Sequence, residues 1–169
     1  MTDRLVYVLG ISPEVSDDAP GTWAELQAHA ETYGPLNLSI SKDGNENTIY
    51  GEGSEGYDKN VNARALHDYL HLHYNADFSV AGERRVAEAT CELFRLMFKS
   101  IMNPEVEAVV RAEVVGQAMF HARWGLFVID QPAFDYAYLK DPAGVLSDRS
   151  WGTPLVPCCT CGYTPVRKS

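Results

Sequence analysis

The stretch Ala65-Leu-His-Asp-Tyr-Leu-His-Leu-His73 decides the fold prediction, because its spacing fits a helix with one functional face. His67 and His71 are four residues apart, which is about one turn of an α-helix, so both imidazoles leave the same face. Two imidazoles at this spacing can bind one metal ion. The stretch therefore predicts a helical core that carries a metal site.

Helices are expected on both sides of this stretch. Ser79 and Asn103 are N-cap residues, and the proline that follows Asn103 suits the first position of a helix. Gly125 suits a helix end, and Asp130 is a further cap. The expected helices cover residues 58–74, 80–102, 104–124 and 130–140.

The N-terminal part has a different pattern. A short apolar run over residues 4–11 predicts a buried strand, and residues 12–21 predict a loop. A helix is expected over residues 22–33, where Gly34 and Pro35 stop it. Asp43-Gly44 predicts a β-hairpin with strands at residues 36–41 and 48–51.

With 169 residues, the chain is expected to form a single domain with a mostly helical α+β fold. Its N-terminal strand, helix and β-hairpin would occupy residues 1–57, an α/β part. An antiparallel helical bundle would follow over residues 58–140, since the connections between its helices are short. Residues 141–169, rich in Pro, Gly and Ser, are expected to be an extended tail.

Glu83 is the acid of its helix that is expected to face inward. The apolar stripe of this helix includes Val86, Phe94 and Met97, and one turn before that stripe is Glu83. Because the helices over 58–74 and 80–102 would be antiparallel neighbours, Glu83 and His71 should lie at the same level.

The next helix adds polar residues at steps of four. Glu113, Gln117 and His121 interrupt an apolar side of the helix over 104–124, and by its distance from the turn His121 should lie near the level of Glu83. His67, His71, Glu83 and His121 are therefore the candidate metal ligands, with Gln117 and Glu113 orienting them. Two histidines and a carboxylate are a common set for one divalent ion, zinc first, with iron or manganese as alternatives.

The same residues also have a purely structural interpretation. A histidine on an amphipathic helix is commonly just a hydrogen-bonded or half-exposed side chain, and Glu83 in a first turn favours the helix dipole. Whether the cluster is catalytic or structural stays open at this point.

His67-Asp-Tyr-Leu-His71 resembles the His-Glu-x-x-His signature of zincin metallohydrolases, with Asp68 in the place of the signature Glu. This resemblance implies that both histidines bind zinc, that Glu83 is the third ligand and that Asp68 is the catalytic base. On position alone, Tyr69 and Arg84 are candidate substrate contacts.

The stretch also resembles three other groups. In His-Asp phosphohydrolases the corresponding ligands would be His29, His67 and Asp68, although a later Asp is missing from the helix over 104–124. The His-Asp-x-x-Tyr helix of small secreted phospholipases A2 is similar, but His71 stands where those enzymes have Tyr. Short phage-associated proteins of unknown function have a similar His-Asp-Tyr-Leu-Tyr helix.

Charge limits the classes of partner. The net charge is −9, and residues 1–60 hold 11 Asp and Glu against 3 Lys and Arg, which disfavours duplex nucleic acid. No apolar run is long enough to span a membrane, and no signal peptide is recognised. We expect a cytoplasmic protein or, if virus-encoded, one that acts in the host cytoplasm. Cys158, Cys159 and Cys161 are expected to be reduced thiols, with a soft-metal site as the alternative.

The leading functional hypothesis is a small metal-dependent hydrolase that acts on a small-molecule or peptide substrate. The alternative is a non-enzymatic phage or host interaction protein, whose acidic surface binds a basic protein partner and whose polar or metal-stabilised core only fixes the helices.

Overall fold

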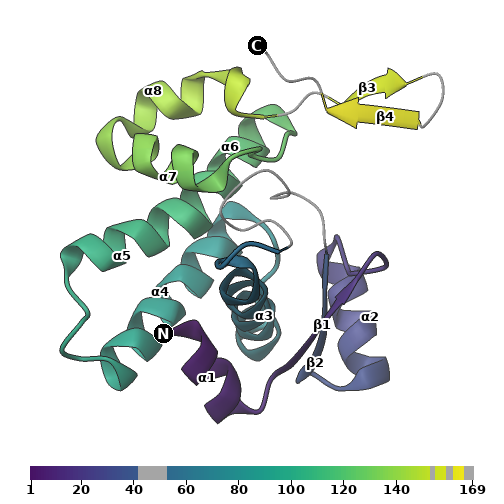
Figure 1. Cartoon of the computed structure of the whole chain (residues 1–169), viewed down its shortest axis with the longest axis vertical. Coiled ribbons are helices and arrows are strands. Elements are labelled where there is room, and N and C mark those ends of the chain that lie inside the picture. The colour runs from purple at the N-terminus through teal and green to yellow at the C-terminus, as the bar shows by residue number, and fades with distance from the viewer. Residues whose placement is uncertain (42–52, 153–154, 159–161, 166–169) are drawn as a thin grey trace.

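The computed structural model describes residues 1–41, 53–152, 155–158 and 162–165. The fold is mostly helical α+β, as expected (Figure 1). The α-helices are α1 (Thr2–Leu9), α2 (Trp23–Tyr33), α3 (Tyr57–Tyr74), α4 (Val80–Met97), α5 (Pro104–Arg111), α6 (Gln117–Trp124), α7 (Gln131–Lys140) and α8 (Pro142–Ser147). A π-helical segment, η1 (Ala112–Gly116), joins α5 to α6, and a 3-10 turn, η2 (Arg149–Trp151), follows α8. The strands are β1 (Ser12–Ser16), β2 (Asn37–Ser41), β3 (Leu155–Cys158) and β4 (Gly162–Pro165).

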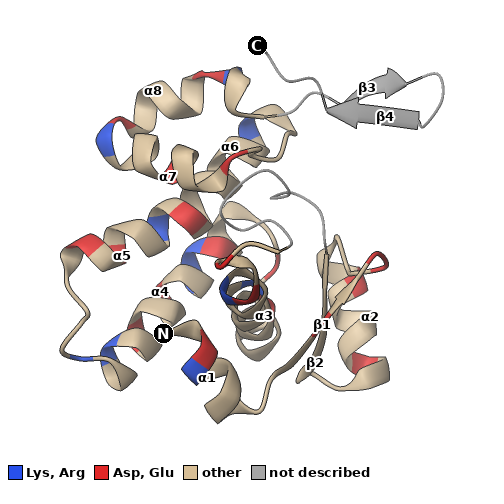
Figure 2. Cartoon of the chain, in the orientation of Figure 1, with Lys and Arg blue, Asp and Glu red and all other residues tan. Residues whose placement is uncertain are grey.

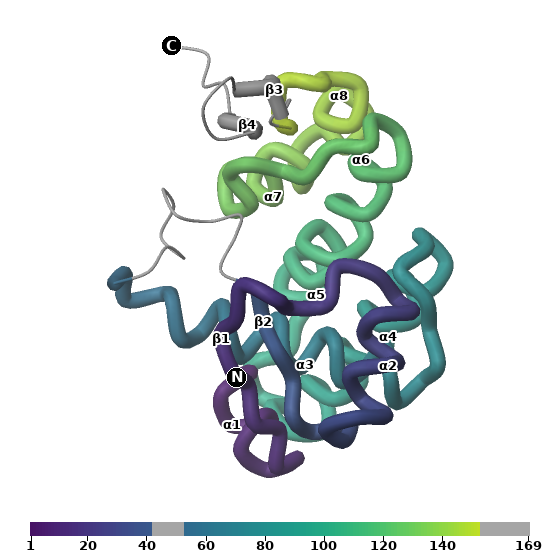
Figure 3. The backbone as a smooth tube through the Cα atoms, turned by 90° about the vertical axis from the view of Figure 1, so that its right-hand side faces the viewer, coloured from purple at the N-terminus to yellow at the C-terminus, as the bar shows by residue number. Residues whose placement is uncertain are grey.

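The described residues form two hydrophobic cores. The larger one surrounds α3, which packs against α1, α4 and the β1–β2 pair, and its most buried side chains include Leu5, Leu38, Leu66, Leu70 and Val86. The smaller one joins α6, α7 and α8 around Phe120 and Phe134. Figure 3 shows these three helices above the rest of the molecule, with α5 leading from one part to the other.

The expected helix starts are confirmed where a side chain caps them. The Ser79 hydroxyl accepts a hydrogen bond from the Gly82 amide, and Asn103 accepts from the amides of Glu105 and Val106. Asp130 caps α7 in the same way, through the Ala133 amide. Capping is local chemistry, which is why the sequence alone locates these helix starts.

The strand predicted over residues 4–11 is wrong, because residues 2–9 form helix α1. Leu5 and Val6 are buried in the larger core, while Tyr7 and Val8 point outward and are exposed. Gly10 ends the helix with a left-handed φ of 72°, a conformation that glycine adopts without strain. A short apolar run does not distinguish a strand from a helix, and here packing against α3 decides.

The predicted β-hairpin is also wrong. Residues 37–41 form a strand, but β2 pairs in parallel with β1, from Ser12 opposite Asn37 to Ser16 opposite Ser41. Helix α2 connects the two strands, as a parallel pair requires a long crossover. The segment expected as a loop thus contains β1, and residues 48–51, expected as the second hairpin strand, lie outside the described residues.

The two long predicted helices are confirmed in position but differ in detail. The helix expected over 80–102 ends at Met97. The helix expected over 104–124 does run from Pro104 to Trp124, but its middle five residues are π-helical. Gly125 ends it with a left-handed φ of 64°. A π-helical segment accommodates extra residues per turn, so it changes the direction of every side chain after it.

The C-terminal part is more structured than the extended tail predicted for residues 141–169. Asp141 caps α8 through the Gly144 amide, and Pro142 stands at its first position. Trp151 packs edge-on against Phe134 in the smaller core. Strands β3 and β4 then pair antiparallel. Among the described residues, no helix is both long and apolar enough to cross a membrane.

Candidate metal centre

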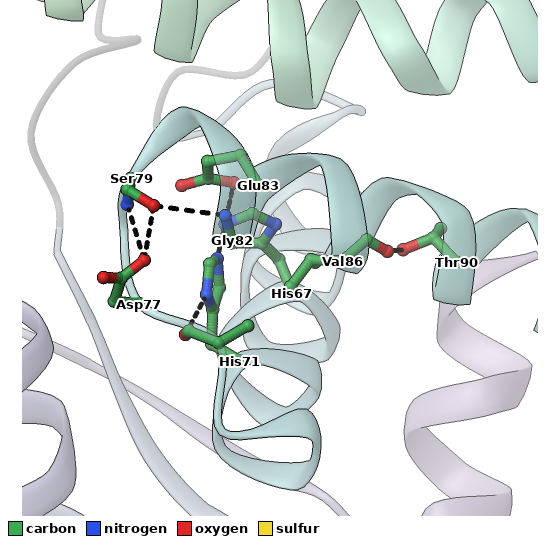
Figure 4. Close-up of polar contacts among 9 residues, drawn as sticks. His67, His71, Asp77, Ser79, Gly82, Glu83, Val86 and Thr90 are labelled. Carbon is green, nitrogen blue, oxygen red and sulfur yellow. Dashed lines mark hydrogen bonds and ion pairs between the residues drawn. The ribbon is translucent and has the colours of Figure 1, made fainter.

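His67, His71 and Glu83 meet between α3 and α4, and form a possible metal-ligand group. The two imidazole Nε2 atoms are 3.0 Å apart, and each lies 3.4 Å from Glu83 Oε2 (Figure 4). Ligands bound tetrahedrally at about 2.0–2.1 Å from a zinc ion lie about 3.3 Å from one another. The three atoms therefore already have the mutual distances of a zinc ligand set.

The orientation of His71 is fixed from its other side. Its Nδ1 lies 2.7 Å from the Ala76 carbonyl oxygen, and a carbonyl only accepts, so Nδ1 donates. A neutral His71 consequently presents an Nε2 lone pair to Glu83 and His67. Metal-binding histidines commonly donate their second ring nitrogen to a carbonyl or carboxylate in this manner.

The Ala76 carbonyl is held by a tight turn between α3 and α4. Asn75 adopts a left-handed φ of 48°, and the Ala76 amide donates back to the His71 carbonyl. Asp77 Oδ1 accepts from the Ser79 amide, and the first turn of α4 packs closely on this turn (Figure 4). A Cβ on Gly82 would lie only 1.8 Å from the Asp77 carbonyl oxygen. Glycine is therefore required at position 82 for the turn to approach α4. This close approach keeps the Ala76 carbonyl in place beside His71.

Aromatic rings enclose the buried side of the group. Phe78 meets the His71 ring edge-on at 4.7 Å between centroids, and Trp23 from α2 lies 6.4 Å from the same ring. His71 is fully buried, whereas the His67 side chain keeps 28% of its surface exposed. The side of His67 is therefore the side of the group that is open to solvent.

The protonation of the group follows from burial and from Glu83. Burial lowers the pKa of His67 to about 4, so this imidazole is neutral at physiological pH. Burial also tends to lower the pKa of His71, but the adjacent Glu83 carboxylate and its negative charge outweigh the effect of burial, and the pKa of His71 is raised. Burial raises the pKa of Asp68, the neighbour of His67, to about 7.

Two occupants suit this arrangement. A proton on His71 makes an ion pair with Glu83, which is the metal-free solution. Yet Glu83 Oε2 is buried and accepts no hydrogen bond within the described part of the chain, and the two facing Nε2 atoms compete for one proton. A divalent cation would satisfy all three atoms at once, since a neutral imidazole and a carboxylate are both metal ligands.

His121 is not brought to this group. It is exposed on α6, where Nδ1 faces the Leu126 carbonyl oxygen at 3.2 Å and the ring stacks on Phe127 at 4.4 Å. Its predicted level depended on counting regular helical turns from Asn103. The π-helical segment Ala112–Gly116 breaks that count and turns the residues after it to a different side.

Gln117 and Glu113, expected to orient the ligands, belong instead to a second buried polar cluster. They face Asp135 of α7, a residue that is only 8% exposed. Burial, then the adjacent Glu113 carboxylate, raises the pKa of Asp135. Asp135 was not among the predicted residues, although its position three residues before Tyr138, on the inner side of α7, was a signal for it.

The other candidate residues have ordinary surroundings. His29, the first ligand implied by the phosphohydrolase resemblance, bonds to the Asn37 carbonyl and stacks on Tyr33 outside the group. Tyr69 stacks on His73. Arg84 is exposed on α4 and lines a cavity described below. Cys158 lies in β3, and Cys159 and Cys161 lie outside the described residues.

Comparisons with protein-family models, with curated proteins and with solved structures found no match. The resemblance to zincins thus stays a prediction that depends on the spacing of His67 and His71 and on the acid between them.

Proposed function

We propose that the protein binds one divalent metal ion, zinc in the first place, through His67, His71 and Glu83, and that it is a metal-dependent hydrolase. The observation that supports metal binding is the triangle of Nε2, Nε2 and Oε2 atoms with sides of 3.0, 3.4 and 3.4 Å. The hydrogen bond from His71 to Ala76 supports it further, because it keeps a lone pair aimed into the triangle.

Three protein ligands leave one position open for water or substrate, as in catalytic zinc sites. A bound zinc ion acts as a Lewis acid and lowers the pKa of water bound to it to about 7. His67, on the accessible side, lies where a substrate would approach. Asp68 follows His67 on α3 and is the proposed base that would accept a proton during hydrolysis.

Elemental analysis of the full chain, purified without an affinity tag, tests the metal. We expect about one equivalent of zinc, iron or manganese in the wild type and none in the His67→Ala/His71→Ala variant. His73→Ala is the matched control, since His73 lies on the same helix but is exposed. Wild-type protein that stays metal-free after incubation with each ion, or a His73→Ala variant that loses the metal equally, would contradict the proposal.

Turnover tests the hydrolase assignment separately. The metal-loaded wild type is assayed against peptide, ester and phosphoester substrates, before and after removal of the metal with a chelator. We expect Asp68→Asn to retain its metal but to lose at least about a hundredfold in kcat, the usual contribution of a general base. Loss of turnover together with loss of metal in Asp68→Asn would instead make Asp68 part of the binding site. A metal-loaded wild type that is inactive on all three substrate classes would leave a structural metal site.

One observation favours the alternative of an interaction protein. No Lys or Arg occurs between Leu5 and Ser41, and acidic residues lie on β1 and α2, while β2 has no charged residue (Figure 2). Such a surface suits a basic protein partner. If the metal only stabilises the fold, chelation should lower the melting temperature while binding of a basic partner persists below that temperature.

A further inference from the structure

A cavity lies on a different face of α4 from the one that carries Glu83, among α4, the α5–η1–α6 helix and α7. Its volume is about 400 Å³, which is within the range of small-molecule sites. Arg84 of α4 lines it, although Arg84 directly follows the proposed ligand Glu83. Since successive helical residues point about 100° apart, the cavity and the metal-ligand group lie on different faces of the same helix.

The inner lining of the cavity is largely apolar. Val115, Met119, Tyr138 and Leu139 contribute to it, and the Tyr138 hydroxyl donates to the Met119 sulfur at 3.8 Å. Leu139 is 43% exposed, a large apolar side chain open to solvent. This lining favours an apolar ligand body over a polar one.

The π-helical segment shapes this lining. Gly116 allows the Tyr138 ring to lie directly against η1, since a Cβ at position 116 would be 3.2–3.3 Å from three ring carbons. π-helical segments occur frequently at functional sites, although they are rare overall.

The rim of the cavity carries positive charge on an acidic protein. Arg84 forms no ion pair within the described part of the chain, and Arg111 has only a long contact of 3.8 Å with Glu88 Oε1. Figure 2 shows both basic and acidic residues on α4 and α5, the two helices that carry this rim. A guanidinium group binds a carboxylate through two parallel hydrogen bonds, so two arginines at one mouth suit a single anionic group.

We propose that this cavity is a binding site for a small amphipathic acid, a molecule with an apolar body and one carboxylate at its end. The apolar body lies against Val115, Met119 and Tyr138, and the carboxylate pairs with Arg84 and Arg111 at the rim. Glu88 opposes binding, because it competes with the ligand for Arg111.

Calorimetric titration of the full chain with decanoate, below the concentration at which it forms micelles, tests this site. We expect saturable binding at one equivalent, about tenfold weaker in Arg84→Gln and in Arg111→Gln. Arg85→Gln is the matched control, since Arg85 is the next residue of α4, lies over the Tyr74 ring and does not line the cavity. Glu88→Gln is expected to bind more tightly than the wild type.

The location of the ligand is tested with two further arms. Ala108→Phe, which fills the cavity from α5, should remove binding of both decanoate and decanol, while the arginine variants should weaken only decanoate. The His67→Ala/His71→Ala variant should bind decanoate as the wild type does, so this inference can succeed or fail independently of the metal. Circular dichroism melting confirms that each variant is folded.

Three results would overturn the inference. They are an absence of decanoate binding to the folded wild type, an equal loss in Arg85→Gln and Arg84→Gln, and a loss of binding in the double histidine variant. The second would indicate attraction by general surface charge, and the third would place the carboxylate on the metal-ligand group.

Discussion

Two buried polar clusters lie in this molecule, and they are built from opposite chemistry. In the first, two histidines and Glu83 converge, and the Ala76 carbonyl fixes one ring from outside. In the second, Asp135 faces Glu113 and Gln117, and both Asp135 Oδ1 and Gln117 Nε2 are buried without a hydrogen-bond partner in the described residues. The first cluster combines two imidazoles with one carboxylate, whereas the second places two carboxyl groups together.

The difference determines what each cluster can hold. Imidazole lone pairs and a carboxylate attract a divalent cation, and their mutual distances of 3.0–3.4 Å match its ligand shell. Two adjacent buried carboxyl groups repel when both are ionised, so they retain a proton instead. Burial alone therefore does not mark a metal site, and the protonation of the ligand atoms distinguishes the two clusters.

Stabilisation by zinc is the largest effect that we expect to separate the two clusters. At a free zinc concentration about a thousand times Kd, binding to the folded state alone adds about 4 kcal/mol to the free energy of unfolding. We expect Glu83→Gln to lose most of this gain and Glu88→Gln, five residues along α4, to keep it. Thermal unfolding with and without zinc measures both. Equal gains in the two variants would mean that zinc binds elsewhere.

The turn that fixes His71 gives the next largest effect. Gly82→Ala would push a methyl group into the Asp77 carbonyl and destabilise the protein by about 1–3 kcal/mol. Because the Ala76 carbonyl moves with the turn, zinc affinity should fall as well. Gly21→Ala is the control, since its Cβ would meet only a side-chain oxygen at 3.7 Å. Denaturant unfolding and zinc titration measure the two effects, and an unchanged zinc affinity in a destabilised Gly82→Ala would refute a role of the turn in binding.

The second cluster, with Asp135 and Glu113, is expected to make the stability of the protein depend on pH. The pKa of Asp135 is raised in the folded state, so above its ordinary value of 3.8 the folded protein holds a proton that the unfolded chain releases. This contribution lowers stability as the pH rises. Asp135→Asn should remove that slope and stabilise the protein by about 1 kcal/mol at neutral pH. Urea unfolding between pH 5 and 8 tests the slope, with the exposed Glu92→Gln as control. A slope unchanged in Asp135→Asn would contradict the raised pKa of Asp135.

The smallest expected effect concerns His121. Because it is exposed and stacks only on the exposed Phe127, His121→Ala should change stability by less than about 0.5 kcal/mol and leave zinc affinity unchanged. Zinc titration of this variant and of His67→Ala compares a ligand of the group in the structure with His121, the fourth ligand predicted from helical spacing. A loss of zinc in His121→Ala would mean that α6 moves on binding.

The sequence allowed prediction of the features that depend on neighbouring residues. The caps at Ser79, Asn103 and Asp130, and the four-residue spacing of His67 and His71, are local and were correct. Glu83 was predicted to lie level with His71 because only a short turn separates their helices, and that geometry holds.

Features that depend on distant packing could not be predicted. The apolar run over residues 4–11 is compatible with a helix or a strand. Only packing against α3, about fifty residues later in the chain, favours the helix. The partner of β2 is β1, a strand with Pro13 and Glu14 and no apolar pattern of its own. The predicted position of His121 was wrong because the sequence of Ala112–Gly116 does not indicate a π-helical segment.

The position of Trp23 gives the proposed centre an optical reporter. Its indole lies 6.4 Å from the His71 ring, whereas Trp124 and Trp151 belong to the smaller core. A paramagnetic ion such as Cu²⁺ or Co²⁺ at the histidines would quench the emission of Trp23 before that of the other two indoles. Arrival of an ion can therefore be followed in real time through light that the unlabelled protein itself emits.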